Sequence, residues 1–225
     1  MDAFTHPLPT IGLTVDVVVF TILDNQLQAL LIRRASEPFR GQWALPGGYL
    51  QESEVSLESA RRILHDKAGV GDMFLEQLFT FDELQRDPRG RVVSIAYFAL
   101  VPASRLQPSD IDSTQEPTLY PVTALPELAF DHRTIIEYAI TRLQAKLQYT
   151  NVAFSLLPPL FTFAQLQITY EVILGRPLDK RNFQKKFVSL DLIEQTDELT
   201  SGAKHRPARL YKFASHSPAE LKKFF

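Results

Sequence analysis

The chain has 225 residues, enough for one large domain or two smaller ones, and 45% of them are apolar and 22% charged. This composition is ordinary for a soluble globular protein, and the absence of cysteine excludes disulfides and thiolate metal sites. No apolar run reaches the roughly 18 residues of a membrane helix, and the N-terminus resembles no secretion signal, so a cytoplasmic protein is expected.

The net charge of −2 is unevenly distributed along the chain. Residues 1–150 carry 13 Lys and Arg against 19 Asp and Glu, whereas residues 151–225 carry 11 against 7. A basic portion is one compositional sign of nucleic-acid binding, although solvated basic faces are also common on proteins that bind none. The asymmetry therefore only indicates where DNA-contacting residues should be sought.

Strand-like and turn-like segments alternate through the first half of the chain. Strands are predicted at residues 13–23, 26–34, 74–84 and 91–101. The turn dipeptide Asp24-Asn25 joins the first two as a hairpin, and a turn at residues 86–90 separates the last two. A loop punctuated by proline and glycine leads into a helix between these two pairs. This order predicts a mixed α/β domain of the α+β class.

Two faces of that first helix are predicted from residue spacing. The apolar stripe is expected to comprise Leu57, Ala60, Leu64 and Ala68, with Gly69 ending the helix. Positions 63, 66 and 67 lie three and four residues apart, which places Ile63, Asp66 and Lys67 on one common face.

A second, longer helix is predicted from about residue 132 to 149. Its buried stripe is expected to comprise Ile136, Ala139, Ile140, Leu143 and Leu147. The prolines of "LLPPLFTF" then break the pattern, which predicts a domain boundary near 150–160. The expected domains are residues 1–150 and 151–225.

The second domain reads as helix, turn, helix and β-hairpin. Thr162 and Gln165 fit a capping box that opens the first of these helices, and Asp179 caps the second. On the second helix the side chains of Phe183, Phe187 and Leu190 are expected to face inward. Strands at 192–196 and 208–214 follow, joined by a polar, basic loop. This is the layout of a winged helix-turn-helix.

The segment "GGYLQESEVSLESARRILHDKAGV" carries a resemblance that runs over 23 residues. Gly48, Glu54, Arg62, Leu64, Gly69 and Val70 fall at the spacings of the Nudix box. The resemblance implies an α/β/α sandwich, and the three helix acids of the family's metal site map onto Ile63, Asp66 and Lys67. One carboxylate survives in this degenerate box, and a lysine occupies the position of a metal ligand.

The lost carboxylates predict a Nudix domain without catalysis. A site for two or three divalent ions needs several oxygen ligands around each ion, and the charge of Lys67 would repel a metal nearby. No catalytic residue, metal or cofactor is therefore expected. The alternative is that Glu52 or Glu58 supplies substitute ligands. The chain would then be an Mg²⁺-dependent ADP-ribose pyrophosphatase with an accessory C-terminal domain.

The apparatus for holding a nucleoside diphosphate remains in the sequence. The backbone of Gly47 and Gly48 can approach phosphates closely, and Arg33 and Arg34 can pair with phosphate oxygens. Phe39 and Trp43 are candidates for stacking on a base, although Trp43 is equally compatible with core packing.

The segments "FDELQRDPRGRVVSIAYFAL" and "LPELAFDH" look like the ADP-ribose-hydrolysing branch of the Nudix family. That resemblance implies ADP-ribose as the ligand, and Phe81 and Tyr97 are included among its expected contacts. His65 and His132 read as caps, exposed groups or packed polar residues, and not as catalysts.

A Nudix domain followed by a winged helix resembles the Nudix-related transcriptional regulators of NAD metabolism, the NrtR family. The resemblance implies a homodimeric repressor of NAD synthesis and salvage genes that binds double-stranded operator DNA and is released by ADP-ribose. The expected DNA contacts on the second helix and the wing are Arg181, Asn182, Gln184, Lys185, Lys186, Lys204, His205, Arg206 and Arg209. A winged helix used only for protein contacts is a third alternative.

Overall fold

The computed structural model describes residues 10–71, 73–106, 117–200 and 207–215. Its helices are α1 (Ser56–Ala68), α2 (His132–Lys146), α3 (Phe163–Leu174) and α4 (Lys180–Ser189), with 3₁₀ turns at Ala103–Arg105 and Val152–Leu156. Its strands are β1 (Gly12–Leu23), β2 (Gln26–Arg33), β3 (Trp43–Ala44), β4 (Gly47–Tyr49), β5 (Phe74–Phe81), β6 (Val92–Leu100), β7 (Thr118–Pro121), β8 (Phe161–Thr162), β9 (Ile193–Leu199) and β10 (Arg209–Phe213). Among these described residues, no helix is long and apolar enough to cross a membrane.

The first half of the chain forms a mixed sheet. Its strand order is β3-β2-β1-β6-β5, with β4 also paired to β1 and β7 to β2. The predicted hairpin is confirmed, since β1 and β2 pair antiparallel and their turn residues Asp24 and Asn25 have φ angles of 52° and 57°. Asp and Asn are the side chains that best tolerate the positive φ of such a two-residue turn after glycine.

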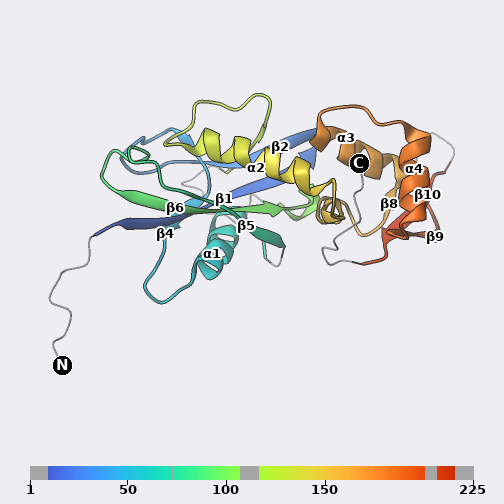
Figure 1. Ribbon diagram of the computed structural model, residues 1–225, viewed down its shortest axis with the longest axis horizontal. Coiled ribbons are helices and arrows are strands. Elements are labelled where there is room, and N and C mark those ends of the chain that lie inside the picture. Colours follow the sequence, from blue (N-terminus) through green and yellow to red (C-terminus); the bar gives the residue numbers. More distant parts are fainter. Residues whose placement is uncertain (1–9, 72, 107–116, 201–206, 216–225) are drawn as a thin grey trace.

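Helices cover both faces of this sheet, with α1 on one side and α2 on the other (Figure 1). Alternate residues of a strand point to opposite faces, so Val15, Val17 and Val19 of β1 pack under α1, while Val18 and Phe20 pack on the α2 side. A strand buried on both faces needs apolar residues at successive positions, which explains the run in β1. The predicted α/β/α sandwich is confirmed.

The C-terminal part packs against the end of α2 (Figure 1). The capping box of α3 is formed in both directions: Thr162 N donates to Gln165 Oε1 at 2.8 Å, and Gln165 N donates to Thr162 Oγ1 at 3.2 Å. Asp179 caps α4 by accepting from Asn182 N at 2.8 Å. A three-stranded sheet in the order β8-β10-β9 completes the predicted winged helix-turn-helix.

The core is continuous between the two parts. Phe183 and Phe187 of α4 are buried against Tyr170 of α3. These aromatic side chains belong to the same apolar cluster as Phe20 in the sheet and Leu143 in α2. The winged helix is therefore joined to the α2 side of the sandwich by packed side chains as well as by the chain itself.

The structure corrects several expectations about the helices and the wing. Ile63 does not share a face with Asp66: Ile63 is buried on the side of α1 that packs against the sheet, whereas the side chain of Asp66 is 53% exposed. Burial of an isoleucine side chain stabilises the fold, so Ile63 points towards the sheet. Leu57, placed in the buried stripe, is exposed at the first turn. Helix α2 ends at Lys146, three residues early, and the first wing strand extends to Leu199.

Candidate ligand pocket and nucleic-acid interface

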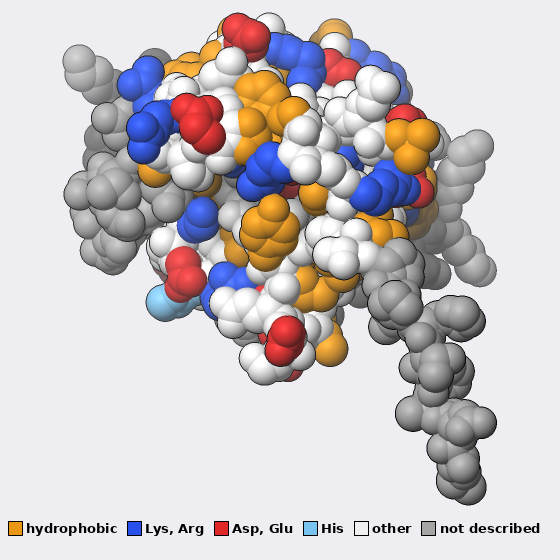
Figure 2. Space-filling view, turned by 90° about the vertical axis from the view of Figure 1, so that its left-hand side faces the viewer, with side chains coloured by type: hydrophobic (Ala, Val, Ile, Leu, Met, Phe, Trp, Pro, Cys, Tyr) orange, Lys and Arg blue, Asp and Glu red, His pale blue; other side chains and the backbone are white. Residues whose placement is uncertain are grey.

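A pocket of about 240 Å³ lies between β1, β4, the last turn of α1 and the loops that follow β2 and β5. Its charged lining residues among the described part of the chain are Asp16, Arg33, Arg34, Lys67, Arg86, Asp87 and Arg89. Five cations against two carboxylates favour an anionic ligand. Figure 2 shows Lys and Arg side chains spread over one end of the molecule, with Asp and Glu side chains between them.

Two of the five cations are held by carboxylates. The guanidinium of Arg86, 3% exposed, donates to both oxygens of Asp131 at 2.7 and 3.0 Å and lies 3.6 Å from Asp16. Arg89 binds Asp87 in the same two-pronged way, at 2.6 and 3.0 Å, and this lowers the pKa of Asp87. These pairs build a rigid polar wall.

His132, the first residue of α2, connects these charged groups to the segment between β3 and β4. Its Nδ1 accepts a hydrogen bond from Leu45 N at 2.9 Å, and its Nε2 lies 3.7 Å from Asp16. Burial lowers the pKa of His132, so the ring is neutral with its proton on Nε2. His132 is thus a packed polar residue, one of the alternatives that the sequence offered. A Cβ at Gly47 would lie 2.1 Å from Asp16 Oδ1, so this close approach requires glycine.

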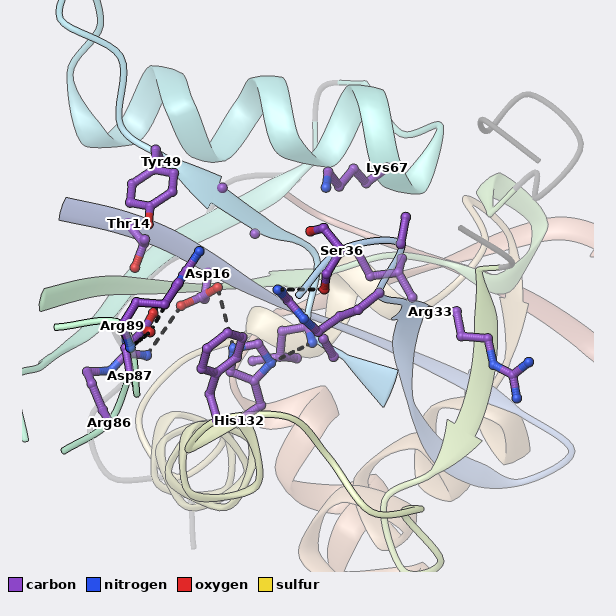
Figure 3. Close-up of a pocket in the computed structure, with 18 residues that line it drawn as sticks. Thr14, Asp16, Arg33, Ser36, Tyr49, Lys67, Arg86, Asp87, Arg89 and His132 are labelled. Carbon is purple, nitrogen blue, oxygen red and sulfur yellow. Dashed lines mark hydrogen bonds and ion pairs between the residues drawn. The ribbon is translucent and has the colours of Figure 1, made fainter. Parts of the chain in front are cut away.

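Arg34 and Lys67 are the cations that remain available to a ligand. Among the described residues, the side chain of Arg34 donates to the carbonyl oxygens of Pro38 at 2.8 Å and Ser36 at 3.4 Å, and its guanidinium lies over the Phe130 ring. Its pKa is lowered by burial and by the nearby charge of Arg89. Lys67 reaches over the pocket from α1 (Figure 3). Burial and the charge of Arg34 lower the pKa of its ammonium.

The structure does not bring every predicted ligand contact to this pocket. Arg34, Gly47 and Gly48 line it, and Arg33 lines its edge with a guanidinium directed away from the other charged groups, 5.3 Å from the Trp43 ring centre (Figure 3). The four aromatic candidates pack elsewhere: Phe39 on Phe130, Trp43 on Tyr120, Phe81 on Tyr138, and Tyr97 under α1 with its hydroxyl bonded to Ser56. Their role as ligand contacts stays a prediction.

Several residues that line the pocket were not predicted from the sequence as ligand contacts. Arg86 and Arg89 lie in a segment that was interpreted as a turn and as similar to ADP-ribose hydrolases, but neither was named as a ligand contact, and Asp16 lies in a segment interpreted only as a strand. Asp16 was the available signal, because a carboxylate inside an otherwise apolar buried strand needs a partner.

The predicted DNA-contacting side chains divide into three groups. Arg181, Asn182, Gln184 and Lys185 are exposed within the first six residues of α4, and Lys186 is half-buried. Arg209 is exposed at the start of β10, in the wing. Lys204, His205 and Arg206 lie outside the described residues. The first turns of the second helix are where a winged helix-turn-helix meets base edges.

Family models match both halves of the chain. The NUDIX domain model matches residues 12–139, and the model described as the NrtR DNA-binding winged helix domain matches residues 153–213. The chain belongs to the NrtR family.

Similar proteins align with most of this NrtR chain. It is 39% identical over 213 residues to the "ADPR responsive transcriptional repressor NtrR" of Acinetobacter baylyi, covering 93% of this chain and 84% of that protein. The crystal structure of Shewanella oneidensis NrtR complexed with a 27mer DNA superposes with a TM-score of 0.81 at 37% identity, covering 89% of this chain and 93% of that one. The NUDIX domain of the same protein complexed with ADP ribose gives 0.55 at 39% identity, over 60% of this chain and 90% of that domain.

The residues at the Nudix box of this chain do not fit a divalent metal. Ile63 is in the core, Asp66 is exposed and lies 3.1 Å from His65, and Lys67 is itself a cation. Glu54 is held by Arg62 at 2.7 and 3.0 Å, which lowers the pKa of Glu54 to about 2. Within the described ranges, no three His, Asp or Glu side chains are grouped to hold a metal ion. A dication needs several oxygen ligands, which these positions do not supply.

Proposed function

We propose that this protein is a repressor of NAD synthesis and salvage genes that binds operator DNA and is released by ADP-ribose. One observation carries this proposal: a winged helix with basic side chains exposed on α4 shares a continuous core with a Nudix pocket rich in cations. The relatives named as an ADPR-responsive repressor and solved with DNA and with ADP ribose support both halves of it. We place it in the cytoplasm.

The pocket supports a diphosphate-containing effector. Arg34 and Lys67 can pair with phosphate oxygens, while the backbone of Gly48 faces open space and can approach a phosphate closely. Arg86 and Arg89 are neutralised by carboxylates, so their part is to hold the wall in place. ADP-ribose joins its two riboses through a diphosphate and so matches this charge.

The Nudix domain of this protein is proposed to bind without hydrolysing. The three helix positions that carry acids in the Nudix box are Ile63, Asp66 and Lys67, and one of them is buried in the core. An effector must persist to be sensed, so loss of hydrolysis suits a sensor. Incubation with ADP-ribose and Mg²⁺ or Mn²⁺ should release no AMP; turnover that depends on Asp66 or Glu54 would instead favour the pyrophosphatase alternative.

Helix α2 offers a route from effector to DNA. His132 at its start contacts the pocket strands, and its last turns pack on the winged helix. In a homodimer on a two-fold operator, a small movement of α2 changes the spacing of the two α4 helices. A coupling free energy of only a few kcal/mol between ADP-ribose binding and DNA binding is enough to release the protein from the operator.

The test is selection of genomic DNA fragments on the purified protein, with elution by ADP-ribose. Recovered fragments are expected to share a two-fold element upstream of genes for NAD synthesis or salvage. Fragments without a common element, or elution by buffer and ADP-ribose alike, would contradict the proposal.

A further inference from the structure

Two of the pocket cations, Arg34 and Lys67, come from different elements and form no ion pair with a carboxylate among the described residues. Arg34 follows β2, and Lys67 lies in the last turn of α1. Within the described residues Lys67 takes part in no hydrogen bond or ion pair, although it is half-buried and lines the pocket. Burying a lysine costs free energy, and here the charges of Asp66 and Asp16 offset that cost only in part, because the pKa of Lys67 is still lowered.

Lys67 occupies a position of the Nudix box that bears a metal-binding acid in the family. It is the last of the three box positions that bear acids in the Nudix family, and it is the one of the three that lines the pocket. Ile63 has joined the core and Asp66 faces solvent beside His65. A cation of the protein therefore stands where the box places a ligand for a cation.

We infer that the Lys67 ammonium replaces the divalent metal as the counter-ion of the bound diphosphate, so that effector binding is independent of divalent cations. This inference rests on the proposed function and adds the charge chemistry of the same site. A tethered ammonium attracts phosphate oxygens through charge-assisted hydrogen bonds. It cannot generate the metal-bound hydroxide that attacks a pyrophosphate, so it binds the ligand without cleaving it.

The electrostatic surroundings of Lys67 support this role. Arg34 and Arg62 oppose its charge, whereas Asp66 and Asp16 favour it, and burial outweighs both, so the pKa of the free site is lowered. A bound diphosphate supplies the missing negative charge in a partly desolvated site. Two cations from different elements can also pair with the two phosphates at once, which fixes the ligand's orientation.

The experiment is calorimetric titration of the full chain with ADP-ribose, in EDTA and in excess Mg²⁺. Wild type is expected to bind equally in both buffers. Lys67→Met keeps the length and apolar stem of the side chain and should bind about 10- to 100-fold more weakly in both, the loss of one charge-assisted hydrogen bond. Lys67→Arg should retain most of the affinity. Arg61→Met removes an exposed cation from the same helix outside the pocket and should bind as wild type.

Lys67→Glu separates the charge of the residue from its size. Its binding should be weakest in EDTA and recover in part with Mg²⁺, because a carboxylate again offers a metal ligand. Binding by wild type only with Mg²⁺, or unchanged affinity in Lys67→Met, would overturn the inference and leave the repressor proposal standing. If wild type binds ADP-ribose neither in EDTA nor in excess Mg²⁺, the effector assignment is overturned, and the inference with it.

Discussion

The side-chain amide of Gln144 on α2 donates a hydrogen bond of 2.9 Å to the carbonyl oxygen of Ile173 on α3. Ile173 lies in the last turn of its helix, where carbonyl oxygens lack partners within the helix. Because α2 begins at His132 beside the pocket, this bond fastens the winged helix to the element that meets the effector site.

Gln144→Met is therefore expected to weaken the response while sparing both binding activities. Coupling changes of about 0.5–2 kcal/mol are usual for residues between two sites, which corresponds to roughly 2- to 30-fold more ADP-ribose needed for half-release of DNA. Titration of a protein–DNA complex with ADP-ribose measures this. Gln148→Met, exposed just after α2, is the matched control. An unchanged release concentration would mean that coupling takes another route.

Arg181→Ala with Lys185→Ala should abolish selective operator binding and leave ADP-ribose affinity unchanged. Both side chains are exposed on the first turns of α4, whose buried face is formed by Phe183 and Phe187, so truncation should not unfold the domain. Each lost phosphate contact reduces the slope of log affinity against log salt by about 0.9. Anisotropy at several salt concentrations measures both effects. Simultaneous loss of ADP-ribose binding would argue against separate roles for the two parts.

Arg86→Met should destabilise the protein strongly. Removing this guanidinium leaves Asp16 buried beside a neutral histidine, and breaking a buried pair in this way costs about 3–5 kcal/mol. Chemical denaturation measures the loss. Arg142→Met also removes an arginine from the first part of the chain, but within the described residues this arginine donates to a backbone carbonyl oxygen, that of Leu78, and not to a carboxylate. Equal effects of the two substitutions would contradict the assigned role of Arg86.

The affinity for ADP-ribose should fall at alkaline pH. Burial and the charge of Arg34 lower the pKa of Lys67 below its ordinary 10.5, so its ammonium is lost at a lower pH than that of an exposed lysine. Calorimetry between pH 7 and 10 should show a decline in wild type that is absent in Lys67→Arg, because arginine keeps its charge. The same decline in both proteins would assign it to another group.

Glu54 is expected to stabilise the fold in a pH-dependent way, without a catalytic part. Arg62 holds the pKa of Glu54 at about 2, below its ordinary 4.5, so the stabilisation is present above pH 4.5 and is lost as pH falls through about 2. Glu54→Gln should therefore unfold more easily than wild type at pH 7, with the difference shrinking in acid. A difference that stays constant with pH would mean that the pair contributes nothing through charge.

Locally determined elements were predictable from the sequence. The β1–β2 hairpin follows from Asp24-Asn25, and the start of α3 follows from Thr162 and Gln165, because these signals lie within a few residues of one another. The degenerate Nudix box could also be recognised from the sequence, because its glycines, arginine and apolar positions keep fixed spacings.

The wall of the pocket was not predictable, because its partners are far apart in the chain. Arg86 and Asp131 are separated by 45 residues, Asp16 and Ser94 by 78, and Leu45 and His132 by 87. The direction of Ile63 was misjudged for a related reason. Spacing predicts which residues share a helix face only approximately, and the sheet beneath α1 decides which side chain leaves water.

The central claim is that one ligand in the Nudix pocket controls DNA binding by α4. The most direct test is fluorescence anisotropy of duplexes from promoters of NAD-synthesis genes, at fixed salt, with and without ADP-ribose. We predict tight, sequence-selective binding that ADP-ribose abolishes, with the nucleotide recovered intact. Absence of selective binding to any duplex, together with consumption of ADP-ribose, would contradict the account and identify the domain as a hydrolase.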